Sequence, residues 1–261
     1  MSRNPIRVAA VGLGLALVLA ATALGARGGD EKVFCAGNIC VTDDGGISPD
    51  ELPKRGKAPV TARLHAQVET RDGTHPPALQ TVDIEIDRTI EVDAVGLPTC
   101  KAAQLQSRDT AAAKKACGSA IVGSGKAEVE VAFPEQAPFR STGPLVLFNG
   151  GVQGPTTTVF IHAYVNVPAP TAIVTRATVT RIDGGRFGLR IGAKIPKVAG
   201  GSGSLTMFDL RVGRKFTYRG ARKSFLMAGC PTGSWLARGN ARFEDGTRLA
   251  LSHVFSCTPK G

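Results

Sequence analysis

Aromatic side chains are scarce in this chain. Phe, Tyr and Trp together make up 5% of its 261 residues, and there are only two tyrosines and one tryptophan. Proteins that hold single-stranded nucleic acid stack its bases on aromatic rings, and glycan binders use rings in the same way. So small a stock of rings argues against a dedicated binder of either kind, and we expect no specific nucleic-acid partner.

Histidine is also rare, and the sequence lacks the common metal and nucleotide motifs. No two histidines form a His-x-His or His-x-x-x-His pair, and no second cysteine pair stands at zinc-ligand spacing beside Cys35 and Cys40. A phosphate-binding loop and a dinucleotide-binding fingerprint are missing too. We therefore expect no metal and no cofactor. The four histidines are His65, His75, His162 and His253.

No serine stands in a hydrolase motif. Ser124 and Ser202 each lie between glycines, but neither is part of a Gly-x-Ser-x-Gly sequence. The carboxylates Asp83, Glu85 and Asp87 share one face of an expected strand, and an outward acidic face explains them more simply than a glycosidase pair does. We expect no catalytic residue. An extracellular hydrolase with an unfamiliar site remains an alternative.

Long apolar runs are limited to the N-terminus. Arg3 and Arg7 precede an uncharged stretch over 8–26, with small residues at Ala21 and Ala23. This pattern predicts a signal peptide over residues 1–26. A retained anchor is the alternative, since a bilayer span needs about 20 residues. No later run is long enough to cross a membrane, so the sequence predicts a secreted or cell-surface protein.

Six cysteines behind an export signal predict disulfides. They fall into three pairs that are close in sequence: Cys35/Cys40, Cys100/Cys117 and Cys230/Cys257. Residues 101–117 carry helix formers, but one straight helix would place Cys100 and Cys117 about 25 Å apart. A disulfide needs Cα atoms within roughly 7 Å. The Cys100/Cys117 pair therefore predicts a break near residues 107–109, between two short helical pieces.

Most of the chain alternates apolar and polar residues with the period of a β-strand. Val60 to Val68 is the first of about twelve such runs, which are separated by glycine-rich turns. The pattern predicts an all-β fold, an antiparallel β-sandwich of jelly-roll or immunoglobulin-like type with one helical excursion around 101–117. We expect a flexible linker over 27–58 and a sandwich domain over 59–261, with a division into two packed halves near 167–175 left open.

Positive charge is concentrated in the last third of the chain. Residues 176–261 contain 16 Lys/Arg and only four Asp/Glu, whereas residues 1–175 are nearly balanced with 16 against 17. The net charge of +11 therefore comes from the C-terminal part. Such a face attracts anionic polymers or membranes through summed electrostatics. The alternative is that these residues serve solubility or pair with acidic strands earlier in the chain.

Two clusters of side chains in the sequence are candidate binding sites. Phe160, His162 and Tyr164 share a strand face, where packing is the default interpretation and a ligand pocket the alternative. The second cluster is basic, with Phe216 and Tyr218 interleaved, and is the candidate site for an anionic polymer. An edge strand protected by charge against aggregation explains it as well. Its members are Arg211, Arg214, Lys215, Arg219, Arg222 and Lys223.

Several short motifs together suggest a relationship. They are Gly-Leu-Pro-Thr-Cys at 96–100, Ala-Cys-Gly-Ser-Ala-Ile-Val-Gly-Ser-Gly at 116–125, Leu-Phe-Asn-Gly-Gly at 147–151, Cys-Pro-Thr-Gly at 230–233 and Phe-Glu-Asp-Gly-Thr-Arg-Leu at 243–249. In this combination the chain resembles a family of exported β-rich proteins from soil actinobacteria, over most of residues 58–258. The resemblance implies export, bacterial origin and the Cys100/Cys117 and Cys230/Cys257 pairs. It implies no activity and no catalytic residue.

The sequence thus predicts a non-enzymatic β-sandwich protein of the cell surface or medium. Its basic C-terminal third is expected to contact an anionic cell-envelope polymer, matrix or glycan. A hydrolase and a carrier of a small ligand or lipid are the alternatives. Oligomeric state has no signature in the sequence.

Overall fold

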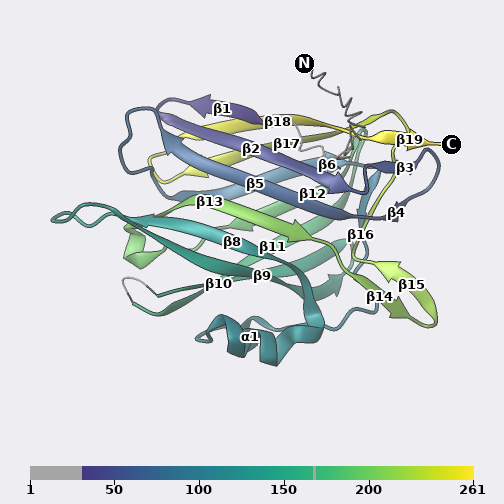
Figure 1. Ribbon diagram of the computed structural model, residues 1–261, viewed down its shortest axis with the longest axis horizontal. Coiled ribbons are helices and arrows are strands. Elements are labelled where there is room, and N and C mark those ends of the chain that lie inside the picture. The colour runs from purple at the N-terminus through teal and green to yellow at the C-terminus, as the bar shows by residue number, and fades with distance from the viewer. Residues whose placement is uncertain (1–30, 167–168) are drawn as a thin grey trace, which may run out of the picture.

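The computed structural model describes residues 31–166 and 169–261, and these form one large antiparallel sheet with small additions at its ends (Figure 1). The predicted signal peptide lies outside the described residues. In the order in which they pair, the strands of the main sheet are β1 (Lys32–Ala36), β2 (Ile39–Ser48), β5 (Thr61–Thr70), β13 (Gly203–Val212), β8 (Ile121–Val131), β9 (Phe139–Gln153), β10 (Thr156–Val165), β11 (Thr171–Gly184), β12 (Phe187–Lys194), β6 (Leu79–Asp87), β17 (Ser234–Phe243) and β18 (Arg248–Ser256).

The main sheet curls until its two edge strands lie beside each other, so that it forms a nearly closed cylinder (Figure 1). The strand prediction is confirmed: the fold is all-β, and the main sheet is antiparallel. Instead of the two separate layers expected of a sandwich, however, a single continuous ladder runs from β1 to β18. Curling lets every strand of the ladder turn one face to a common interior, which removes most of the free sheet edge.

The interior of the cylinder follows from the period of two. Inward side chains such as Ala127, Val179 and Leu189 alternate with more exposed residues and pack into the main core cluster. Among the described residues Trp235 is the largest fully buried side chain, and its indole N–H donates to the Gly229 carbonyl at 2.7 Å. The strands before and after 167–175 alternate around the sheet, so there is no division into two halves there.

A polar pair bridges the seam between the two edges of the sheet. His253 of β18 is 3% exposed and lies on the same strand face as core residue Leu249. Its Nδ1 is 2.8 Å from Oδ2 of Asp43 in β2, and its ring stacks on Phe255 at 4.0 Å between centroids. Side-chain contacts, rather than a backbone ladder, therefore join the edges at this point.

Three short pairings cover one end of the cylinder. These are the sheet of β4 (Ala58–Pro59), β16 (Leu226–Ala228) and β7 (Ile90–Val92), the parallel pair β19 (Thr258–Lys260) and β3 (Glu51–Pro53), and the hairpin of β14 (Lys215–Tyr218) and β15 (Ala221–Ser224). The disulfide Cys230–Cys257 ties the chain after β16 to the end of β18, which confirms the predicted pair.

The helical excursion is built as the cysteine spacing predicts. The 3-10 turn η1 (Ala102–Gln104) and helix α1 (Thr110–Cys117) are separated at Ser107, whose φ is +59°. Asp109 caps α1 by accepting from the Ala112 amide at 2.7 Å. A further 3-10 turn, η2 (Gly118–Ala120), follows, and the last one, η3 (Ala199–Gly201), precedes β13. The Cys100–Cys117 disulfide closes the excursion.

The predicted linker over 27–58 is wrong for most of its length. Residues 32–48 form β1 and β2, a hairpin whose turn follows Ala36 and whose disulfide joins Cys35 to Cys40, paired directly across the strands. The alternation of buried residues at Ile39 and Val41 is typical of a strand. The glycines and aspartates at 43–46 favour a turn instead, but in the structure they continue the strand and pair with β5 in register.

Candidate functional site

The basic cluster predicted from the sequence lies on and beside the β14–β15 hairpin (Figure 1). The two-residue turn of this hairpin is Arg219-Gly220. Both residues have positive φ, +51° and +78°, as a type I′ turn requires. The register places Lys215 and Arg222 on one face of the hairpin, and Phe216, Tyr218 and Lys223 on the other. The cluster is therefore divided between two faces.

One face of the hairpin is fixed to the protein. The Tyr218 ring lies directly on Gly96, where even a Cβ atom would come within 2.2 Å of it. Lys223 Nζ is 2.9 Å from Oδ2 of Asp93 and 5.5 Å from the Tyr218 ring centroid. At the base of the hairpin, the Arg214 guanidinium donates to the carbonyl of Ile121 at 2.7 Å. Lys223 and Arg214 thus serve to attach the hairpin.

The other four cations of the cluster point outward without a counter-charge. Within the part of the chain that the structure describes, none of them has a carboxylate partner, and all four are exposed. Arg219 lies 5.2 Å above the Tyr218 ring centroid, which holds its guanidinium at the tip of the hairpin. From 210 to 243 the sequence contains no acidic residue. These four, Arg211, Lys215, Arg219 and Arg222, are called the free cations below.

Several basic residues elsewhere on the sheet are neutralised by carboxylates. The acidic face of β6 lies between β12 and β17, where Glu85 contacts Arg190 at 2.6 Å and Arg238 at 2.7 Å. Hydrogen bonds from Arg190 and then Arg238 lower the pKa of Glu85 below its ordinary value of 4.5. Seven of the 16 basic residues after 175 have such partners: Arg181, Arg186, Arg190, Lys197, Lys223, Arg238 and Lys260.

A small apolar hollow lies next to the hairpin. It has a volume of about 140 Å³ and is lined mainly by Val92, Ala94, Val95, Val152 and Pro155. Asp93, the partner of Lys223, also lines it. The hollow and the hairpin therefore share the loop that follows β7.

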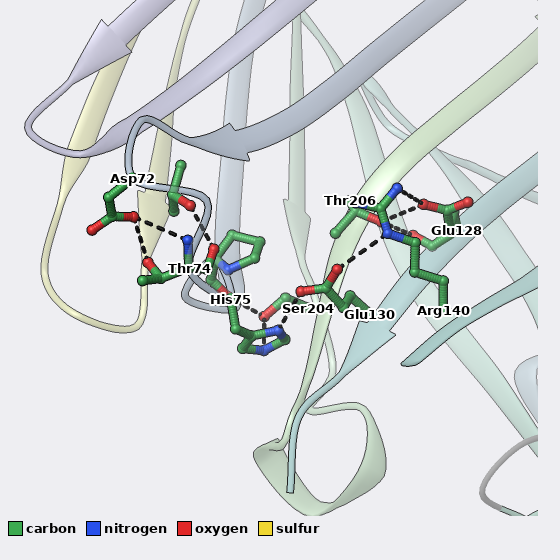
Figure 2. Close-up of polar contacts among 10 residues, drawn as sticks. Asp72, Thr74, His75, Glu128, Glu130, Arg140, Ser204 and Thr206 are labelled. Carbon is green, nitrogen blue, oxygen red and sulfur yellow. Dashed lines mark hydrogen bonds and ion pairs between the residues drawn. The ribbon is translucent and has the colours of Figure 1, made fainter. Parts of the chain in front are cut away.

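A second polar cluster occupies the opposite end of the strands, around the start of β13 (Figure 2). His75 Nδ1 is 3.0 Å from Oε1 of Glu130, and its Nε2 is 3.1 Å from the Ser204 hydroxyl. Arg140 contacts Glu130 and Glu128, both at 3.1 Å. The contacts are those of a serine–histidine–carboxylate triad, which no spacing in the sequence indicated.

The state of Ser204 does not fit a nucleophile. The side chain is 2% exposed, and its hydroxyl donates to the carbonyl of Pro76 at 2.5 Å. Its hydrogen is thus not directed at His75, and substrate has no path to the oxygen. The nearby hollow of about 530 Å³ is open and lined only by loop residues 133–136. As it stands, the cluster fastens the loop after β5 to β8 and β13.

His162 lies under the helical excursion. It is fully buried, and its Nε2 is 3.0 Å from the Arg108 carbonyl. Phe160 packs beside it against Phe148 and the Cys100–Cys117 disulfide. This supports the packing interpretation of the strand face over a ligand pocket there.

Comparisons with protein-family models, with curated proteins and with solved structures found no match to this chain. The relationship to exported actinobacterial proteins therefore stays a prediction. In the described ranges, no helix is long and apolar enough to cross a membrane, and no three His, Cys, Asp or Glu side chains gather as a metal site. Three disulfides fit an extracellular protein.

Proposed function

We propose that this protein acts outside the cell, without catalysis, by binding an anionic polymer of the envelope or matrix through the β14–β15 hairpin. The observation that carries the proposal is the grouping of unpaired cations. Arg190 and Arg238 on the sheet have a carboxylate partner, and unpaired cations such as Arg176 and Lys194 lie on separate strands of the sheet. Only in the basic cluster do four unpaired cations of the described residues lie together, on and beside one hairpin: Arg211, Lys215, Arg219 and Arg222.

Electrostatics give this grouping a consequence. The field of a paired arginine is largely cancelled by its partner, but several unpaired cations close together add their potentials and attract a polyanion over a Debye length of about 10 Å. The rigid attachment of the hairpin at Tyr218 and Arg214 keeps the free cations at fixed spacing. Binding to a polymer of repeated charges then needs no stacking platform, in keeping with the few aromatic residues.

The test is retention on immobilised polyphosphate and heparin. We expect Arg211→Glu, Lys215→Glu, Arg219→Glu and Arg222→Glu together to abolish retention. The matched control reverses four exposed cations elsewhere that also lack carboxylate partners in the described ranges, namely Arg176, Lys194, Arg242 and Arg248. Both variants change the net charge equally. Equal loss of retention in both, or full retention of the hairpin variant, would refute the proposal.

The two alternatives receive less support. A hydrolase has the His75–Ser204–Glu130 contacts in its favour, but the buried hydroxyl of Ser204 is already committed to Pro76. A carrier needs an internal cavity, whereas the interior is packed with side chains such as Trp235 and Phe225.

A further inference from the structure

The apolar hollow beside the hairpin is itself a candidate binding site. Val95 is 49% exposed and Val152 is 46% exposed, although valine side chains are usually buried. They are two of only five large hydrophobic side chains exposed among the described residues, and both line this one hollow. Exposed apolar groups gathered around a concave surface mark a place where an apolar group binds.

A chain of contacts connects the hollow to Arg219, one of the free cations. Arg219 lies over the Tyr218 ring, the ring lies on Gly96, and Gly96 follows Val95 at the rim of the hollow. The charged groups that line the hollow are already neutralised: Asp93 by Lys223 at 2.9 Å, and Arg181 by Glu91 at 2.9 Å. No unpaired carboxylate at the rim repels an anion bound next to it.

We propose that the hollow binds the end of an acyl chain carried by the anionic polymer whose charged groups lie on the hairpin. The inference rests on the proposed function and specifies its ligand as an anionic amphiphile. The volume of about 140 Å³ holds roughly five water-sized groups, at about 30 Å³ each. It is smaller than the roughly 300–1,000 Å³ of a pocket that encloses a whole ligand, so it suits a short apolar segment.

The size of the hollow makes the proposal quantitative. Alkyl phosphates from methyl to octyl, below their micelle concentrations, are titrated into the full chain by calorimetry. We expect affinity to increase about fourfold per methylene as carbons enter the hollow, and to level off once about five carbons fill it. An affinity that does not change with chain length, or one that keeps increasing up to octyl phosphate, would overturn the proposal.

Valine-to-threonine variants locate the binding. Val95→Thr with Val152→Thr keeps the shape but places hydroxyls in the hollow, so we expect the dependence on chain length to disappear. Val254→Thr alters an exposed valine on β18, away from the hollow, and should leave it unchanged. If the double variant keeps the wild-type dependence, the acyl site is refuted, even where polyphosphate retention persists. The proposed function is tested separately by retention of the wild-type protein on polyphosphate, and it fails if the wild-type protein is not retained.

Discussion

At the scale of single residues, Glu85 shows how the fold uses charge. It receives hydrogen bonds from Arg190 and Arg238 on the two neighbouring strands, and the Arg238 guanidinium also lies 4.2 Å from the Phe187 ring centroid. One carboxylate thus holds β12 and β17 against β6. Pairing of the later basic residues with earlier acidic strands was one alternative from the sequence, but the sequence did not show which strands meet. Arg190 lies 105 residues from Glu85, and strand order is not encoded locally.

This arrangement predicts an acid-dependent contribution to stability. Because the folded-state pKa of Glu85 is lowered, its contribution is fully present above the ordinary value of 4.5 and is lost as the pH falls through the lower, folded-state value. We expect Glu85→Gln to lower the free energy of unfolding at pH 7 and to differ less from wild type in acid. Urea titrations between pH 7 and pH 3 measure this, with Asp183→Asn as an exposed control. A difference independent of pH would contradict the assignment.

Gly96 is the residue on which the hairpin's position depends. Its φ is +92°, and an added Cβ would meet the Tyr218 ring at 2.2 Å. We expect Gly96→Ala to cost about 1 kcal/mol for the backbone and about 1–3 kcal/mol more for displacing the ring. Gly73→Ala, at φ +72° with open space around it, is expected to show only the first cost. Urea denaturation compares them, and equal costs would mean that Tyr218 does not anchor the hairpin.

At the scale of elements, the sequence predicted most strands and the broken excursion. Alternation over 60–68 correctly placed β5, and the Cys100/Cys117 spacing placed the break before α1. The β1–β2 hairpin was missed because the partners of its polar residues lie far away in the sequence. Asp43, for example, meets His253 some 210 positions later. The free cations were found as a cluster, but their separation from the two anchoring residues required the register of the hairpin.

The three disulfides should stabilise in the order of the loops that they close. Their sequence separations are 5, 17 and 27 residues. In the chain-entropy model this corresponds to about 2, 3 and 3.5 kcal/mol at 25 °C. Replacing each pair by alanines and measuring urea unfolding tests the order, with Cys35/Cys40 as the smallest effect. If that pair proved the most costly to remove, the N-terminal hairpin would contribute more to closing the sheet than its loop length implies.

At the scale of the whole molecule, the two ends of the cylinder differ in character. One end holds the His75–Ser204–Glu130 cluster, in which only Ser204 is fully buried and whose hydrogen bonds are used within the fold. The other carries the hairpin, the free cations and the apolar hollow. The sequence located the excess of positive charge in the last third, but only the folded sheet shows which part of that charge is neutralised. We therefore propose that polyanion binding depends on one end of the molecule rather than on the net charge.

The most direct test is the salt dependence of polyphosphate binding by the wild-type chain and the two charge-reversal variants. Four phosphate contacts, at about 0.7–0.9 per contact, predict a slope of log K against log salt near −3. We expect the slope to fall close to zero in the hairpin variant and to stay near −3 in the variant at positions 176, 194, 242 and 248. Slopes that fall equally in the two variants would show that binding follows net charge, and would contradict the assignment to the hairpin.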